Sequence, residues 1–331
     1  MDAPTRSTVE DAPEAASRCR RVAKLTAGGG LLLAAAGYAI ATVDPRAWAD
    51  VGFGVVASLG GLVLCNIVLT GLLFWSVTRA FPLRRPVGRG KMVALIAVSG
   101  LLNYLPLIRA GLWGRAAYLR RHHGLSLRDS MKIAVVVLIL AAAVVGGGGA
   151  VLLVSMRRGD PGGGVGPGAW FALAAAWLVL TVVVDRFTRR WGQPAGAGWG
   201  WVPLRVLDFA AATARVWLSF KVMGAELGLG QAAVLSSASL LTKLSGLTPN
   251  GLGLAEWVVT GLAAAISPAE AGRAASAALL DRGVEVAAAV VAGLAGLWML
   301  ARWDRQEKPE GSAHVAATAD SANDDQADRA H

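Results

Sequence analysis

Charged side chains inside otherwise apolar stretches are the residues of this chain whose types could do chemistry. Only 16% of the 331 residues are charged, yet several of these charges lie between runs of aliphatic residues. They are Arg109, Arg115, Asp208, Arg215, Lys243, Glu256, Asp281, Arg282 and Glu285. A charge at membrane depth is costly, so each is a candidate for binding a charged ligand. Two structural explanations stay open: Asp208 could simply pair with Arg215, and the last three residues could lie near the outer surface.

Two of the apolar stretches that hold these charges are interrupted by residues that end helices. Residues 101–123 are broken at Asn103 and Pro106, and residues 232–266 are broken at Thr248-Pro249-Asn250-Gly251. Proline cannot continue the hydrogen-bond ladder of a helix. Irregular backbone at membrane depth is tolerated only inside protein or beside a watery cavity. We therefore expect both breaks to line a polar cavity.

The residues beside the breaks are suited to a charged head group. The N-terminus of a half-helix offers unpaired N–H groups and the positive end of a dipole, which favour an anion. Arg109, Arg115, Lys243 and Arg282 would add charge-assisted contacts to a phosphate group. Glu256 would balance a cation or hold one of the basic groups. The expected ligand is an anionic or zwitterionic lipid whose acyl tails stay in the bilayer.

Patterns that would indicate catalysis or a metal site are missing from the sequence. His122 and His123 lie in a basic loop, and His314 and His331 lie in a polar tail, without metal-ligand spacing. No GxSxG motif occurs, and the glycines at 146–149 fall within a predicted span, where small residues indicate close helix packing. We therefore expect no enzymatic activity, no cofactor and no metal ion.

The composition of the chain is that of an integral membrane protein. Hydrophobic residues make up 55% of it and its mean hydropathy is +0.51, which is too apolar for a soluble domain. A helix needs about 20 residues to cross a hydrocarbon core of about 30 Å. The predicted full spans are Val22 to Val43, Val51 to Val77, Ile133 to Met156, Ala169 to Asp185, Val202 to Met223 and Ser276 to Ala301. The expected fold is all-α, with about six full spans and two broken, re-entrant helical hairpins.

The distribution of basic residues predicts the topology. Because basic loops stay in the cytoplasm, both termini are expected there. Residues 92–121 would form a hairpin entering from the cytoplasm, and residues 232–266 a hairpin entering from outside. The order span, span, hairpin, span would then occur twice with opposite orientation, as an inverted repeat, and interrupted segments at matching positions indicate a transporter's central site. The alternative is that each broken segment forms one or two kinked full spans.

Four regions follow from this topology. They are a cytoplasmic polar tail at 1–21, a first membrane repeat at 22–156, a second at 157–303, and a disordered cytoplasmic tail at 304–331. The net charge of +10 is explained by cytoplasmic loops and anionic lipid head groups, so no nucleic-acid partner is expected. No oligomeric state is predicted.

At its two breaks the sequence resembles the lysylphosphatidylglycerol synthase transmembrane region, also called the flippase-like domain family. The residues that carry the resemblance are Asn103, Leu105-Pro106, Arg109, Gly111 and Arg115, then Pro249, Gly251, Gly253 and Glu256, and finally Arg282. The resemblance implies a membrane domain that moves or presents lipid between the leaflets of a bacterial-type plasma membrane. It also implies that these residues bind the lipid head group, and Lys243 joins them as a charge that flanks the second break.

The chain also departs from that family. Leu112 stands where an acidic residue is often found, and the apolar stretch 132–145 replaces a Glu-Arg pair, so the resemblance does not support ion or proton coupling. Full-length synthases add a soluble aminoacyl-transferase domain. This chain continues only about 28 residues past its last predicted span, so it is not expected to synthesise lysyl-lipid alone.

The first functional hypothesis is therefore a lipid flippase. It would pass a phospholipid, an aminoacyl-lipid or a polyprenyl-linked glycolipid across the bilayer through a polar cavity between the two hairpins. A second hypothesis is a non-transporting scaffold that docks a separate glycosyltransferase or aminoacyl-transferase. A third is an enzyme half-site for a lipid substrate, which the missing acid, base and metal patterns disfavour.

Overall fold

The structure is a computed structural model in which the described residues are helical or lie in short connections. It describes residues 26, 29–35, 37–38, 40–41, 51–104, 110–158, 166–189 and 196–306. The helices are α3 (Phe53–Thr78), α4 (Arg89–Leu102), α5 (Ala110–His123), α6 (Leu127–Ala141), α7 (Gly147–Arg158), α8 (Pro167–Arg189), α9 (Ala197–Val222), α10 (Leu229–Ser245), α11 (Leu254–Ile266) and α12 (Ala271–Gln306), with a π-helical turn at Ala142–Gly146 and a 3-10 turn at Pro249–Gly251. The described part contains no strand, which confirms the all-α prediction.

Four helical stretches of the described part are long and apolar enough to cross a membrane. They are Phe53–Thr78, Leu127–Met156, Pro167–Arg189 and Ala271–Gln306, and each contains or closely overlaps a predicted span. The predicted span from Val202 to Met223 corresponds to α9, but this helix is not among the four. Its Arg205, Asp208, Arg215 and Lys221 lower its hydropathy.

Some predictions fall outside the described residues. These are the N-terminal tail at 1–21, part of the first predicted span, Pro106 and Arg109, and the chain beyond 306. Helix α12 continues to Gln306, so it includes the first three residues of the predicted C-terminal tail.

The outer surface of α8 supports a lipid environment. Phe171 is 76% exposed and Val179 is 61% exposed, and Leu178 and Val183 are also more than half exposed. A row of large apolar side chains on the outside of a helix is unfavourable in water. Lipid tails can cover such a surface, so the exposed faces as well as the helix lengths indicate a membrane protein.

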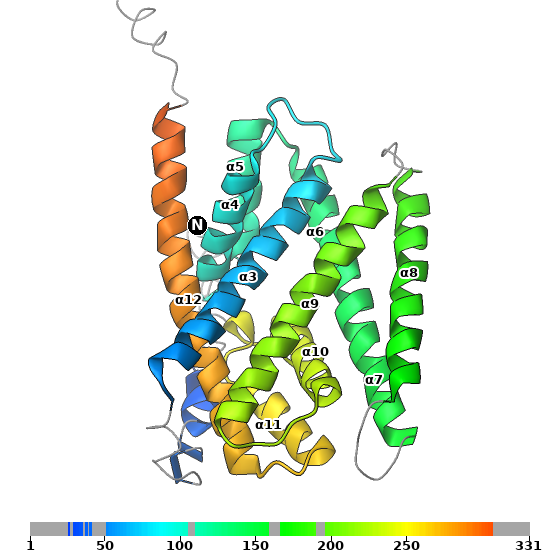
Figure 1. Ribbon diagram of the computed structural model, residues 1–331. Helices are drawn as coiled ribbons and strands as arrows, with labels where there is room; N and C mark the ends of the chain where they lie inside the picture. The colour runs from blue at the N-terminus through cyan, green and yellow to red at the C-terminus, as the bar shows by residue number, and fades with distance from the viewer. Residues whose placement is uncertain are drawn as a thin grey trace, which may run out of the picture.

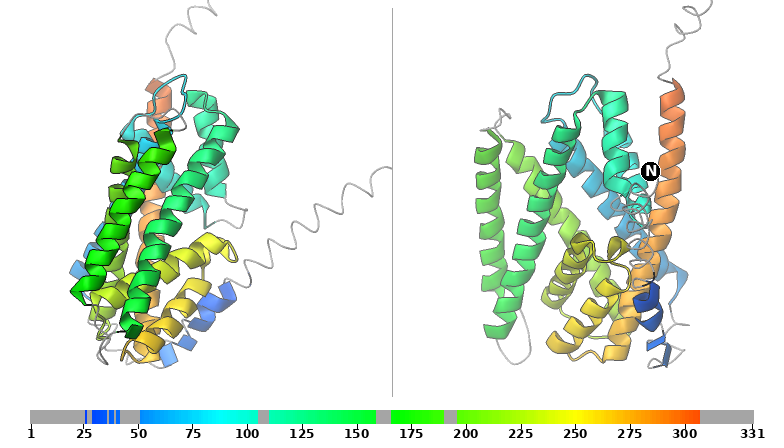
Figure 2. Two further views of the ribbon diagram at one scale, coloured as in Figure 1. Left: turned by 90° about the vertical axis from the view of Figure 1, so that its right-hand side faces the viewer. Right: turned by 180° about the vertical axis from the view of Figure 1, so that it is seen from behind.

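Two helix pairs occupy opposite ends of the molecule (Figures 1 and 2). In Figure 1, α4 and α5 lie in the upper half, whereas α10 and α11 lie in the lower half. The members of each pair pack against each other. Helix α12 runs along the molecule and packs against both α4 and α11, so one helix connects the two pairs.

The two helices of the first pair, α4 and α5, are held together by a glycine contact and by a hydrogen bond to a side chain that caps α5. Helix α4 ends before Asn103, whose side-chain oxygen accepts a hydrogen bond from the backbone N–H of Gly111 at 3.2 Å. A Cβ atom on Gly111 would lie only 2.1 Å from the carbonyl oxygen of Ser99. Glycine at this position therefore lets the start of α5 contact the end of α4, while Asn103 satisfies one of the free N–H groups of the α5 terminus.

The contact between α4 and α12 is equally close. A Cβ on Gly296 would lie 2.8 Å from the carbonyl oxygen of Ala94, and a Cβ on Gly293 would lie 2.6 Å from Cβ of Leu101. Small residues allow helix backbones to approach in this way in membrane proteins. Gly293 therefore makes room for the side chain of Leu101, and Gly296 lets α12 approach the backbone of α4.

Of the glycine run at 146–149, Gly149 packs closely, as predicted, whereas a Cβ on Gly147 would meet no atom within 4 Å. A Cβ on Gly149 would lie 2.4 Å from the hydroxyl oxygen of Ser237 on α10. The same hydroxyl lies 2.8 Å from the carbonyl oxygen of Val145, at the end of the π-helical turn. A π-helical turn disturbs the regular helical hydrogen bonds, and Ser237 supplies an alternative donor here.

Candidate functional site

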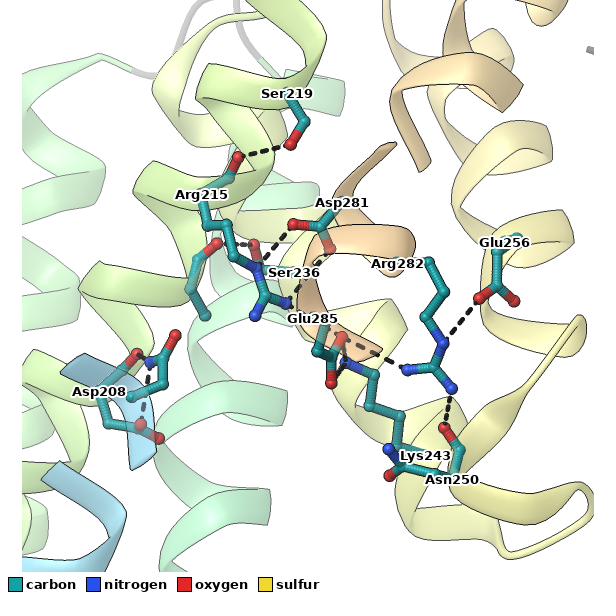
Figure 3. A network of polar contacts seen from close by, with 12 residues as sticks. Asp208, Arg215, Ser219, Ser236, Lys243, Asn250, Glu256, Asp281, Arg282 and Glu285 are labelled. Atoms are coloured by element: carbon teal, nitrogen blue, oxygen red, sulfur yellow. Dashed lines mark hydrogen bonds and ion pairs between the residues drawn. The ribbon is translucent and has the colours of Figure 1, made fainter. Parts of the chain in front are cut away.

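Six buried or largely buried charged residues meet where α9, α10, α11 and α12 come together (Figure 3). We call them the charged cluster: Arg215 from α9, Lys243 from α10, Glu256 from α11, and Asp281, Arg282 and Glu285 from α12. The exposed fractions of their side chains range from 2% for Glu256 to 15% for Glu285. Three are basic and three are acidic, so the cluster is formally neutral.

Glu285 is the acidic centre of the cluster. Its carboxylate lies 2.6 Å and 2.8 Å from Nζ of Lys243, 3.3 Å from Arg282 and 3.4 Å from Arg215. Asp281 lies one turn earlier on α12 and approaches Nε of Arg215 at 2.6 Å. Because residues four apart share one face of a helix, α12 presents both carboxylates to the bases of α9 and α10.

Arg282 joins the two helix breaks. One Nη donates a hydrogen bond of 2.6 Å to the carbonyl oxygen of Asn250, in the break between α10 and α11. Its Nε lies 3.0 Å from an oxygen of Glu256. Its guanidinium lies over the ring of Tyr104, 5.3 Å from the centroid, directly after the end of α4. A single side chain on α12 therefore contacts both interrupted helix pairs.

The break between α10 and α11 is made by residues that accept a left-handed backbone. Gly246 ends α10 with φ at 66°, and Gly251 and Gly253 have φ values of 73° and 76°. Asn250 has φ at 48°, and is the one described residue other than glycine with positive φ. Glycine adopts this conformation without strain and asparagine tolerates it, so the sequence from Gly246 to Gly253 directs the carbonyl of Asn250 towards Arg282.

Replacing Gly251 with alanine is expected to lower the free energy of unfolding by about 1–3 kcal/mol, the usual cost of a strained backbone residue. The new Cβ would sit on a residue with φ at 73° and lie 3.0 Å from Cγ and 3.2 Å from Cα of Lys243. Thermal unfolding of the detergent-purified protein measures the loss. Gly261→Ala is the matched control because its Cβ meets no atom within 4 Å, so it should be neutral or stabilising. Equal losses in both variants would contradict the assignment.

A small cavity of about 20 Å³ lies inside the charged cluster. Lys243, Glu256, Asp281, Arg282 and Glu285 line it, together with apolar and serine side chains. A water molecule needs about 10–15 Å³ of such space. The cavity therefore has room for one water molecule in this conformation, and a lipid head group would need the cluster to open.

The predicted site residues divide into two groups. Lys243, Glu256 and Arg282 come together in the cluster, next to the break that Pro249, Gly251 and Gly253 help to form. Asn103 and Gly111 instead join α4 to α5. Pro106 and Arg109 lie outside the described residues.

Arg115 is apart from the cluster. It is 9% exposed, and its guanidinium lies over the ring of Phe74, 3.8 Å from the centroid. Within the described ranges, no carboxylate is recorded at ion-pair distance from it. A cation over an aromatic face is stabilised by the ring electrons. The contact with Phe74 therefore explains how the charge of Arg115 is tolerated in a buried position without a carboxylate from the charged cluster.

The predicted pairing of Asp208 with Arg215 is wrong. Asp208 does not pair with Arg215; it contacts Arg205 one turn away and accepts a 2.9 Å hydrogen bond from Asn66. Seven residues of helix span about 10.5 Å, so Asp208 and Arg215 are too far apart along α9. Asp281, Arg282 and Glu285 are buried inside the protein, with side chains at most 15% exposed, and their depth relative to the outer membrane surface stays a prediction.

Two participants were not predicted from the sequence. Tyr104 contributes the face of its ring and Asn250 contributes a backbone carbonyl. The only signal for either was its place within a break. No group of three or more His, Cys, Asp or Glu side chains that could hold a metal ion occurs among the described residues.

Comparisons with known proteins do not assign the chain to a family. No protein-family model, no curated protein and no solved structure matches it. The resemblance at the two breaks therefore stays a prediction.

Proposed function

We propose that this protein translocates a lipid with a charged head group between the leaflets of a membrane, without covalent chemistry. The observation that carries the proposal is the contact of Arg282 with both interrupted helix pairs. Charges inside a membrane domain are costly and commonly mark the path of a polar substrate. In a helical protein with four membrane-capable helices, a buried set of six charges at such a junction is best explained by transport.

The topology that belongs to this proposal is an inverted repeat. The α4–α5 pair would enter the bilayer from the cytoplasm and the α10–α11 pair from the other side. Their positions at opposite ends of the molecule support it (Figure 2), and so does the interruption of each pair. Irregular backbone lying inside protein, as at the buried Thr248, Gly251 and Gly253 of this break, is the kind tolerated at membrane depth.

Cysteine labelling tests this topology. In a variant whose native cysteines are replaced, a cysteine at 103 should react with an impermeant reagent from the cytoplasmic side. A cysteine at 247, where Leu247 is 63% exposed, should react from the opposite side. Labelling of both positions from one side would rule out the inverted repeat.

Lipid exchange in proteoliposomes tests the function. Liposomes containing the protein should expose inner-leaflet fluorescent lipid to an external quencher faster than protein-free liposomes. The panel should contain anionic, zwitterionic and polyprenyl-linked lipids. Exchange at the protein-free rate for every lipid would reject transport. Co-purification of a transferase in that case would favour the scaffold hypothesis.

A further inference from the structure

Glu256 is the least well paired carboxylate of the charged cluster. Its side chain is 2% exposed, and one oxygen lies 3.0 Å from Nε of Arg282 without the alignment of a hydrogen bond. The other oxygen is turned away from Arg282 (Figure 3). Neither oxygen has a hydrogen-bond partner among the described residues. A buried anionic acceptor in this condition is strongly unfavourable unless it gains a donor or loses its charge.

The cavity beside Glu256 has room for a molecule that could donate this hydrogen bond. It lies between α9, α10, α11 and α12, with Lys243 and Ser239 on α10 and Ser219 on α9 among its lining residues. Its volume of about 20 Å³ accommodates one water molecule or one hydronium ion. The unpaired carboxylate and the cavity therefore form one site for a very small hydrogen-bond donor.

Every element around Glu256 contributes charged or titratable groups. Their contacts indicate that Glu256, rather than Asp281 or Glu285, is the acid that binds a proton. Lys243 faces it from α10 and Arg282 from α12; Arg215 on α9 and Tyr104 after α4 lie behind them. Glu285 contacts three cations, and Asp281 accepts a hydrogen bond of 3.2 Å from an Nη of Arg215 in addition to its ion-pair contact with Nε. Glu256 contacts one cation through one poorly aligned atom, so protonating it breaks the fewest interactions.

We propose that Glu256 is a proton-binding site and that its protonation gives the charged cluster affinity for one anionic phosphate head group. A hydronium ion in the cavity transfers its proton to a carboxylate oxygen of Glu256 and leaves water. The cluster then holds three cations and two carboxylates, and its net charge changes from zero to +1. One negative charge restores neutrality, so proton and anion bind together. This coupling rests on the proposed function; the protonation of Glu256 does not.

The unmodified protein gives a direct test. Detergent-purified protein in weakly buffered solution should take up about one proton for each phosphatidylglycerol molecule it binds, because the two ligands are thermodynamically linked. At pH values above the one at which Glu256 protonates, each unit by which the pH is lowered should raise the affinity for phosphatidylglycerol about tenfold. Zwitterionic phosphatidylcholine should cause no uptake. Uptake with inorganic phosphate as well would mean that the phosphate group suffices; uptake with the lipid alone would mean that the head group must be presented by a lipid. Anionic-lipid binding without proton uptake would overturn the proposal.

Two variants locate the proton. In infrared difference spectra between acidic and alkaline solution, the carbonyl band of a protonated carboxyl group should be lost in Glu256→Gln. It should persist in Glu226→Gln, which changes an exposed carboxylate. Glu256→Gln should also bind phosphatidylglycerol with no dependence on pH, since its cluster is permanently at +1. An unchanged band in Glu256→Gln would overturn the assignment. If the band is lost in Glu256→Gln but the unmodified protein exchanges no lipid, the proton site stands and only the proposed function is rejected.

Discussion

Replacing Arg282 with methionine is expected to lower the free energy of unfolding by about 3–5 kcal/mol, the range found when one partner of a buried ion pair is removed. The change would leave Glu256 without its cation and would remove one of the three cations around Glu285. It would also free the carbonyl oxygen of Asn250 from its 2.6 Å hydrogen bond. Thermal unfolding in detergent would measure the loss, and lipid exchange should fall to the protein-free rate.

A control variant on the same helix and a compensating second substitution test whether the loss comes from the charged cluster. Arg302→Met alters an exposed arginine of α12 and should change stability by no more than about 0.5 kcal/mol. Combining Arg282→Met with Glu256→Gln leaves two cations and two carboxylates, so the double variant should be more stable than Arg282→Met alone. If the second change instead adds a further loss, the two side chains do not act as a pair.

The second large effect is expected for Glu285→Gln. The substitution keeps the shape of the side chain but removes the carboxylate shared by Lys243, Arg282 and Arg215. Three buried cations would then face two acids, which we expect to cost about 3–5 kcal/mol. The unfolding midpoint in detergent, measured beside the exposed control Glu226→Gln, gives the comparison.

Lys243→Met should partly rescue Glu285→Gln. The pair of changes removes one charge of each sign and leaves Arg215 with Asp281 and Arg282 with Glu256. If the single variant is as stable as the unmodified protein, the neutrality of the cluster is not what stabilises this region.

Local features of the sequence predict the helices and both breaks. Long apolar runs require helices in a membrane, and Asn103 and the segment from Thr248 to Gly253 mark the breaks because Pro, Gly and Asn do not continue a helix. Lys243 and Glu256 were predicted site residues because they flank one break, and Arg282 because it is a charge in an apolar stretch and matches the resembled family. The structure shows that the three lie in one cluster.

The pairing of the charges was beyond the sequence. Which residue of α12 meets Arg215 depends on how α9 rotates against α12, and hydropathy along one helix does not set that rotation. The separation of Asp208 from Arg215, by contrast, follows from their seven-residue spacing on one helix. The carbonyl of Asn250 is a partner that any residue type could supply, so no side-chain pattern reveals it. For the same reason, the neutrality of the cluster became visible only when α9, α10, α11 and α12 were placed together.

The close contacts that Gly293 and Gly296 allow between α12 and α4 bear on how the molecule could open. Because there is no room for even one methyl group between these helices, sliding or rotating one against the other would cause immediate collisions. We therefore expect α4 and α12 to travel as one rigid body. The α10–α11 pair is held to that body at Arg282 and Glu285 by ion pairs and one hydrogen bond, which can exchange partners, so the joint of any rocking movement should lie there.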